Sequence, residues 1–135
     1  MKYVRFLSIL FCTLFSLSSF AADNPLSVHV LNTQNGLPSS GVEVKLEQKK
    51  GNQWILMNEG VTNEQGRITA LYPQNKTLEN GIYRVTFAMD KWFKSHNTET
   101  FFPEIPVVFN VDGKLPHYHI PLLISPYGFS TYRGN

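Results

Sequence analysis

The sequence predicts an all-β fold, an antiparallel sandwich of two sheets with one short helix. About seven short segments alternate apolar and polar residues, which is the pattern of strands with one buried face. Gly, Pro and Asn residues separate these segments at close spacing, and a helical pattern occurs in only one place. Short strands of this kind bury their apolar faces by packing as two layers around one core.

Residues 1–21 have the composition of a secretory signal peptide. Lys2 and Arg5 make a basic start, residues 6–20 are mostly apolar, and the final Ser-Phe-Ala places two small residues before a cleavage site. A transmembrane anchor is the alternative, but the apolar run is short for a bilayer and is interrupted by Ser and Thr residues. We therefore expect cleavage and export to the periplasm, with an extracellular space as the other compartment that a signal peptide allows.

Residues 22–135 are expected to form one domain, because this length can bury one core and is too short for two. Of the 12 Lys and Arg residues, Lys2 and Arg5 leave with the signal, so ten basic residues remain against 10 acidic ones. The resulting formal charge of zero argues against nucleic acid as a partner. Cys12, the only cysteine, also lies in the signal, so the exported domain has no disulfide and no thiol for catalysis or metal binding.

The first strand is predicted over residues 26–31, with Leu26, Val28 and Val30 in the core and His29 on the opposite face. Further strands are predicted over residues 42–47, 54–57, 67–72, 82–87 and 107–111.

A short helix of one or two turns is expected over residues 90–96. It follows a strand whose Tyr83, Val85 and Phe87 are predicted to point inward. Residues 101–106 are expected to form an aromatic, proline-containing connection to the next strand.

The final strand is predicted over residues 117–124, followed by a polar tail. One face of the strand is apolar and belongs to the core; it carries Tyr118, Ile120, Leu122 and Ile124. The opposite face mixes ionisable and apolar side chains, namely His117, His119, Pro121 and Leu123. Because proline cannot donate a ladder hydrogen bond, Pro121 suggests an edge or bulged position, with this face turned toward a partner or a pocket.

His29 and His119 are predicted on the non-core faces of strands from opposite ends of the chain, so they could share one outer surface. Without further evidence, the simpler interpretation of either histidine is a surface or interface residue that makes ordinary hydrogen bonds. His117 lies two residues before His119, so these two could share one zinc ion. We expect no metal, since zinc needs a third ligand and the sequence offers no convincing one. A Gly-x-Ser-x-Gly elbow and a phosphate-binding loop are both absent from the sequence.

Four motifs resemble those of the 5-hydroxyisourate hydrolases, the transthyretin-like enzymes of purine catabolism. They are Ser-Val-His-Val-Leu at 27–31 leading to Gly-Leu-Pro at 36–38, Asn-Glu-Gln-Gly-Arg at 63–67, His-Tyr-His at 117–119, and Tyr-Arg-Gly-Asn at 132–135. The family has an acidic residue where this chain has Asn63, and a final serine where it has Asn135. The second difference leaves the preceding aromatic ring and guanidinium in place.

The resemblance implies a transthyretin-like, or prealbumin-like, sandwich that assembles as a homotetramer of two dimers. It implies hydrolysis of 5-hydroxyisourate to 2-oxo-4-hydroxy-4-carboxy-5-ureidoimidazoline, a step of urate degradation, with no metal and no cofactor. The catalytic residues that it implies are His29, Arg67 and His119. The substrate-binding residues that it implies are His29, Arg67, Ser130, Tyr132, Arg133 and Gly134.

In this reaction water attacks a carbonyl of the six-membered ring, and the adjacent carbon–nitrogen bond opens. Either His29 or His119, or both, would activate the water, because a neutral imidazole titrates near working pH. The planar cation of Arg67 would orient the substrate and stabilise developing negative charge. His96 and His117 are expected to be structural or exposed.

Two other functions fit the composition. A transthyretin-type binding module uses the same fold to hold a hydrophobic hormone between dimers, but such carriers lack the set of His29, Arg67 and His119 and the Tyr-Arg-Gly ending. A periplasmic structural or adhesion sandwich leaves the histidines, the arginine and the terminal motif without a role. The hydrolase is therefore the favoured prediction.

Overall fold

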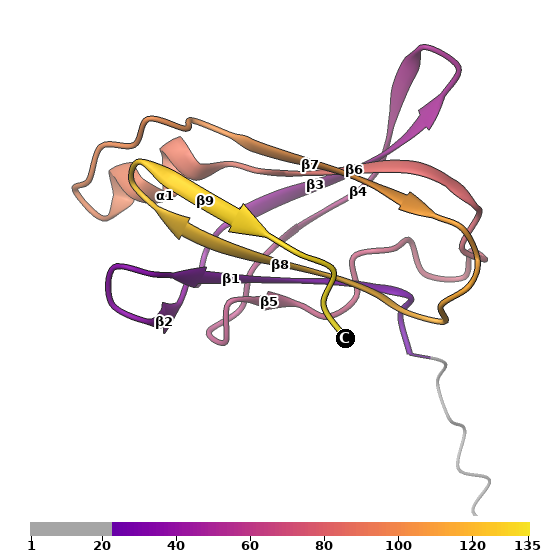
Figure 1. Cartoon of the computed structure of the whole chain (residues 1–135), viewed down its shortest axis with the longest axis horizontal. Coiled ribbons are helices and arrows are strands. Elements are labelled where there is room, and N and C mark those ends of the chain that lie inside the picture. The colour runs from indigo at the N-terminus through magenta and orange to yellow at the C-terminus, as the bar shows by residue number, and fades with distance from the viewer. Residues whose placement is uncertain (1–22) are drawn as a thin grey trace, which may run out of the picture.

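The computed structural model describes residues 23–135, and the predicted signal peptide with Cys12 lies outside them. The elements along the described chain are β1 (Leu26–Asn32), β2 (Leu37–Pro38), β3 (Glu43–Lys50), β4 (Gln53–Val61), β5 (Arg67–Ile68), β6 (Gly81–Phe87), α1 (Met89–Ser95), β7 (Ile105–Val111), β8 (Tyr118–Ser125) and β9 (Gly128–Thr131). The strands form two sheets that lie face to face, and α1 lies at one end of the sandwich (Figure 1). The predicted two-sheet β-sandwich with one short helix is confirmed.

The first sheet brings the two ends of the described chain together. Its strand order is β2-β1-β8-β9, with β5 also paired to β1, and the second sheet has the order β4-β3-β6-β7. All pairs are antiparallel except β1 and β8, which run parallel with Val28 beside Ile120. The N-terminal and C-terminal motifs of the sequence therefore lie on neighbouring strands.

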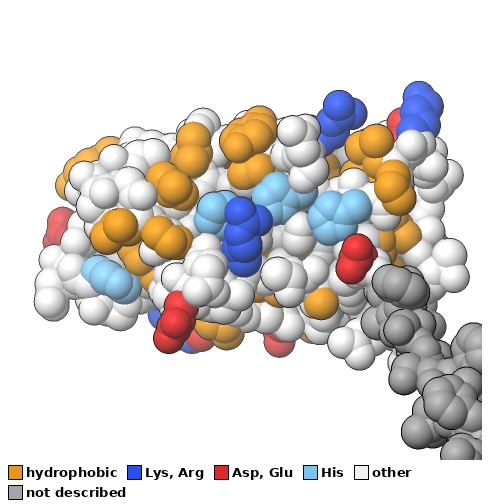
Figure 2. Space-filling view, turned by 90° about the horizontal axis from the view of Figure 1, so that it is seen from below, with side chains coloured by type: hydrophobic (Ala, Val, Ile, Leu, Met, Phe, Trp, Pro, Cys, Tyr) orange, Lys and Arg blue, Asp and Glu red, His pale blue; other side chains and the backbone are white. Residues whose placement is uncertain are grey.

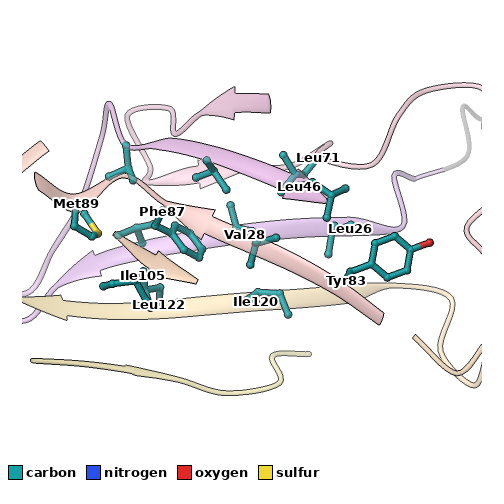
Figure 3. Packing of buried hydrophobic residues seen from close by; sticks show 14 of the residues in the cluster. Leu26, Val28, Leu46, Leu71, Tyr83, Phe87, Met89, Ile105, Ile120 and Leu122 are labelled. Atoms are coloured by element: carbon teal, nitrogen blue, oxygen red, sulfur yellow. The ribbon is translucent and has the colours of Figure 1, made fainter. Parts of the chain in front are cut away.

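The core fills the space between the sheets and is built from alternate residues of their strands (Figure 3). Val28 on β1, Leu122 on β8 and Val85 and Phe87 on β6 are fully buried, as the alternation predicts. Truncating side chains of this kind to alanine costs about 2–5 kcal/mol, because apolar burial is lost and a cavity remains. Burial of this face fixes the register and turns the alternate residues of β1 and β8 outward.

α1 closes one end of the core with Met89, Trp92 and Phe93, all of which are buried. His96 follows the helix; its ring stacks on Trp92 with centroids 4.0 Å apart, and its Nδ1 lies 2.8 Å from the Trp92 carbonyl oxygen. These contacts give His96 a structural role at the helix end, as expected. Within residues 23–135, no helix has the length and apolar character needed to cross a bilayer.

The strand predicted over residues 67–72 is too long, because pairing ends after Ile68. Further along this segment, the backbone of Tyr72 bonds to a side chain. The Asn24 amide nitrogen donates to the Tyr72 carbonyl at 2.8 Å, and the Asn24 side-chain oxygen accepts from the Tyr72 N–H at 3.1 Å. Asn24 thus holds the segment after β5 against the start of β1.

The position predicted for Pro121 is wrong, because β8 lies between β1 and β9 and is not an edge strand. The missing N–H is tolerated for a local reason. Pairing with β9 ends at Leu122 and Thr131, and the Pro121 carbonyl on that side accepts the Thr131 hydroxyl at 2.7 Å. The strand β9 was itself missed, since residues 125–135 were expected to be only a polar tail.

Candidate active site

The outer face of the first sheet carries the predicted catalytic residues. His29 on β1 is paired directly with Arg67 on β5, and His119 lies on the other neighbour of β1, where it is paired with Ser27. Figure 2 shows histidine side chains gathered around a basic side chain on one face of the molecule. The structure thus brings together three residues that are up to 90 positions apart in the sequence, counting from His29 to His119.

The turn before β5 fixes the position of Arg67. The Asn63 side-chain oxygen accepts the backbone N–H groups of Gln65 and Arg67, each at 3.0 Å. Gly66 has a φ of 71°, and a Cβ there would lie 2.5 Å from the Val30 carbonyl oxygen, so this position requires glycine. An amide oxygen accepts the same two bonds that a carboxylate would, which explains how asparagine can stand in the acidic position of the turn.

His119 belongs to a chain of hydrogen bonds that the sequence did not predict. Its Nδ1 lies 2.7 Å from the Ser27 hydroxyl, and the same hydroxyl lies 2.8 Å from Nε2 of His117. The Nδ1 of His117 lies 2.8 Å from the Asn24 carbonyl oxygen. Ser27 and His119 are each only 9% exposed, so these bonds are largely shielded from water. His117 is therefore part of this chain and not a free surface residue.

Burial and positive charge favour the neutral form of both predicted catalytic histidines. Burial lowers the pKa of His29, and the Arg67 guanidinium lowers it further, against an opposing contact with the Gln65 backbone. Burial likewise lowers the pKa of His119, with smaller contributions from Arg67, His117 and His29. A neutral imidazole is the form that accepts a proton, so the site holds two bases beside one permanent cation.

The C-terminal tail lies along β8 beyond the last paired residue of β9. The Gly134 N–H donates to the His119 carbonyl at 2.9 Å. A Cβ at Gly134 would lie 2.4 Å from His119 Cδ2, so only glycine fits against this ring. This contact places the tail of the chain at the His119 imidazole.

Three of the other predicted substrate-binding residues, Arg67, Tyr132 and Arg133, are exposed and divide between two hollows. Arg67, with Ser27 and His117, lines an open cavity of about 1200 Å³. Tyr132 and Arg133 line a second one of about 560 Å³, which His119 also borders. His119 and its Ser27 partner lie between the two.

Ser130 is exposed and lines neither hollow. It is paired with Leu123 across β8 and β9, which places it on the outer face of the sheet.

The zinc alternative rested on His117 and His119. Their rings are stacked with centroids 6.4 Å apart, and both point a nitrogen at the Ser27 hydroxyl. Among residues 23–135, no three His, Cys, Asp or Glu side chains are grouped as ligands for one metal ion.

Three residues of this site were missed by the sequence reasoning or given a different role: Ser27, Asn24 and His117. Ser27 had a readable signal, since it lies two positions before His29 and so shares its outward face. The pairing of Ser27 with His119 depends on the parallel register of β1 and β8, which no local pattern reveals.

The fold and the site together define a class of protein: two-sheet β-sandwiches that carry imidazoles and a guanidinium on the outer face of one sheet. Residues 26–134 match the HIUase/Transthyretin family. The chain belongs to that family, and the resemblance of its motifs is confirmed.

The similar proteins include both 5-hydroxyisourate hydrolases and transthyretins. The chain is 53% identical over 115 residues to the 5-hydroxyisourate hydrolase of Salmonella dublin, covering 85% of this chain and 84% of that protein. The structure of Klebsiella pneumoniae 5-hydroxyisourate hydrolase superposes with a TM-score of 0.71 at 35% identity, over 82% of this chain and 98% of that one. Sea bream transthyretin in complex with thyroxine gives a TM-score of 0.76 at 29% identity, over 82% and 94% of the two chains.

Proposed function

We propose that this protein hydrolyses 5-hydroxyisourate to 2-oxo-4-hydroxy-4-carboxy-5-ureidoimidazoline, in the degradation of urate. The observation that carries the proposal is the position of Arg67 beside two imidazoles of lowered pKa, His29 and His119, on one face of the sheet. The relatives named 5-hydroxyisourate hydrolase indicate the substrate.

These residues can perform the hydrolysis without a covalent intermediate. A neutral imidazole takes a proton from water while the water oxygen bonds to a carbonyl carbon of the six-membered ring; such general-base help is worth about 10²–10⁴-fold. Arg67 stabilises the negative charge that develops on the carbonyl oxygen. The carbon–nitrogen bond then breaks, the imidazolium returns its proton to the leaving nitrogen, and the carbonyl carbon becomes a carboxyl group.

The fold alone does not separate this activity from that of a carrier, because the sandwich superposes on a transthyretin and on a hydrolase almost equally well. The outer face of the first sheet does. A site for a hydrophobic ligand has no use for one buried and one half-buried imidazole beside a guanidinium, since burying ionisable groups is costly unless they have a function.

The test is a spectroscopic assay on residues 22–135. 5-Hydroxyisourate is generated in the cuvette with urate oxidase, and its ultraviolet decay is followed with and without the protein. We expect the protein to accelerate the decay, and expect thyroxine added at the same concentration to bind no more than weakly by fluorescence titration. Spontaneous decay at an unchanged rate, together with tight thyroxine binding, would favour the carrier.

We further propose that the active form is a homotetramer, a dimer of dimers with its sites between the dimers. Large apolar side chains remain on the surface of the single chain, among them Phe101, Val108, Tyr127 and Tyr132. Hydrophobic side chains also surround the histidine face in Figure 2. Covering this face would exclude water and strengthen the effect of the charged groups on the substrate.

Light scattering on the intact protein measures its assembly. Deleting residues 132–135 should abolish turnover, because the Gly134 contact with His119 is lost, while the sandwich keeps its circular dichroism spectrum. An active monomer, or a truncated protein with normal turnover, would contradict this part of the proposal.

Export is a separate proposal, motivated by the basic and apolar residues at the start of the sequence. Expression of the full-length chain in a bacterium, followed by mass spectrometry of the periplasmic fraction, should find a protein shortened by about 21 residues. Full-length protein confined to the cytoplasm would refute it.

A further inference from the structure

We infer that Ser27 and His117 are positioning residues that hold His119 in the tautomer with its proton on Nδ1 and thereby make the Nε2 atom of His119 the general base. The inference rests on the proposed hydrolysis and decides between the two histidines. It follows from four groups joined in series, the Asn24 carbonyl, the His117 ring, the Ser27 hydroxyl and the His119 ring.

The donor and acceptor in each hydrogen bond of this chain can be assigned by starting from the Asn24 carbonyl. A carbonyl oxygen can only accept, so Nδ1 of His117 must carry a proton. A neutral imidazole has a single N–H, so Nε2 of His117 accepts, and its partner at 2.8 Å, the Ser27 hydroxyl, donates to it. The Ser27 oxygen has then used its proton, and at 2.7 Å from His119 it accepts from Nδ1–H of that ring.

The consequence is that Nε2 of His119 keeps its lone pair. The reverse direction requires His117 to carry protons on both nitrogens, so that Ser27 accepts from it and donates to Nδ1 of His119. Nε2 of His119 would then bear the proton and could not act as a base. The ring nitrogens of His117 bond the Asn24 carbonyl and the Ser27 hydroxyl, and within residues 23–135 no carboxylate forms an ion pair with this ring.

The rest of the site holds the ring in this orientation. Ser27 and His119 are neighbours in the parallel register of β1 and β8, and both are 9% exposed, so the bond between them is largely shielded from competing water. Gly134 lies against Cδ2, the ring carbon next to Nε2, and limits rotation from that side. The ring is therefore fixed by a hydrogen bond at one edge and by backbone packing at the other.

His29 has no comparable arrangement. Its neighbours are Arg67, which lowers its pKa, and the backbone of Gln65. A base needs both a neutral state and a fixed orientation toward the substrate. His119 meets both requirements, which leaves His29 to bind the substrate or to stabilise charge together with Arg67.

The decisive measurement is the tautomer of His119 in the folded protein, read from ¹⁵N chemical shifts of the imidazole nitrogens in histidine-labelled protein. We expect the Nδ1–H form in the wild type. This readout needs no substrate, so it tests the hydrogen-bond chain even if the protein hydrolyses something other than 5-hydroxyisourate. A wild-type His119 protonated on Nε2 at neutral pH would overturn the inference.

Variants then link the tautomer to turnover. Ser27→Ala should lower kcat by about 10- to 100-fold with KM little changed, as expected when a group that orients a catalytic histidine is lost. Ser27→Thr keeps the hydroxyl and should restore most of kcat. His117→Phe should act in the same direction as Ser27→Ala, because the Ser27 hydroxyl loses its acceptor and donates to Nδ1 of His119, which favours the wrong tautomer.

Two controls separate positioning from general damage to the fold. His96→Phe changes a histidine whose contacts are with Trp92 and Ser95, and should leave kcat unchanged. The double variant of Ser27 and His117 should cost no more than either single one, since both act through one chain. Wild-type kcat in Ser27→Ala, or full additivity in the double variant, would also overturn the inference.

Discussion

Replacing Gly134 by alanine tests whether the tail positions the His119 ring. A methyl group at this position would lie 2.4 Å from His119 Cδ2, 3.0 Å from Pro121 Cγ and 3.1 Å from His119 Cγ. Ordinary contacts begin near 3.4 Å, so the ring and the tail must separate by about 1 Å. Pro121 borders the same space and its ring is rigid, so the movement falls on the imidazole or on the tail.

The size of this displacement sets the expected loss. A misplacement of about 1 Å in a catalytic group can cost on the order of 10²-fold in rate, because proton transfer and charge stabilisation depend steeply on geometry. We therefore expect kcat/KM for 5-hydroxyisourate to fall about 100-fold in Gly134→Ala. The stability should change little, since the substitution lies in the tail after the last strand and outside the core.

The assay is the ultraviolet decay of 5-hydroxyisourate, combined with urea unfolding of the same preparations. Gly128→Ala is the matched control, because a Cβ there meets Ser125 Oγ at an ordinary 3.6 Å. It should keep its kcat/KM. If folded Gly134→Ala had a kcat/KM within about twofold of the wild type, the tail would not position His119.

Four further predictions follow from the site. The lowered pKa values of His29 and His119 put the acid limb of the kcat/KM profile below pH 6.5, because protonating either imidazole then needs more acid. The Arg67 guanidinium acts on both rings, and His117 is the further titratable group that acts on His119. A limb at or above pH 6.5 would contradict this prediction. As pH falls, these histidines are protonated in the unfolded chain at a higher pH than in the folded protein. The free energy of unfolding should therefore decline as pH falls through 6.5 toward the lowered pKa values, which urea titrations at several pH values would detect. Asn63→Ala should lower the free energy of unfolding by about 1–2 kcal/mol, because two hydrogen bonds are lost. Asn63→Asp should keep both bonds. Equal urea midpoints for the two variants would show that the Asn63 side chain does not stabilise the turn. Dialysis against a strong chelator should leave turnover unchanged, and activity that vanished and returned with zinc would reverse that expectation.

The core could be predicted from the sequence because its pattern is local. Val28, Val85 and Leu122 alternate with polar or outward residues inside their own strands, and a period of two is visible without knowing which strands pair. The same reasoning placed His29 and His119 on outer faces. The helix was predicted close to its observed bounds for a similar reason, since its residues form one continuous segment.

What depends on pairing between distant strands could not be predicted. The parallel register of β1 and β8 brings Ser27 to His119, and it also makes β8 an interior strand in spite of Pro121. After the short β5, the backbone of Tyr72 bonds the side chain of Asn24, 48 residues away, and not a neighbouring strand. Each of these features is decided by contacts between segments and leaves no periodic signal in either one.

The most direct test of the central claim compares the wild type with His29→Ala, Arg67→Ala and His119→Ala in the 5-hydroxyisourate decay assay, with His96→Ala as the control histidine. Loss of a general base is expected to cost about 10²–10⁴-fold in kcat, and loss of the cation that stabilises the developing oxyanion about 10²–10³-fold. Circular dichroism spectra should match the wild type, because all three side chains lie on the outer face of the first sheet and not in the core between the sheets. The account predicts three folded, nearly inactive variants beside an active control; three folded variants with near-normal turnover would contradict it.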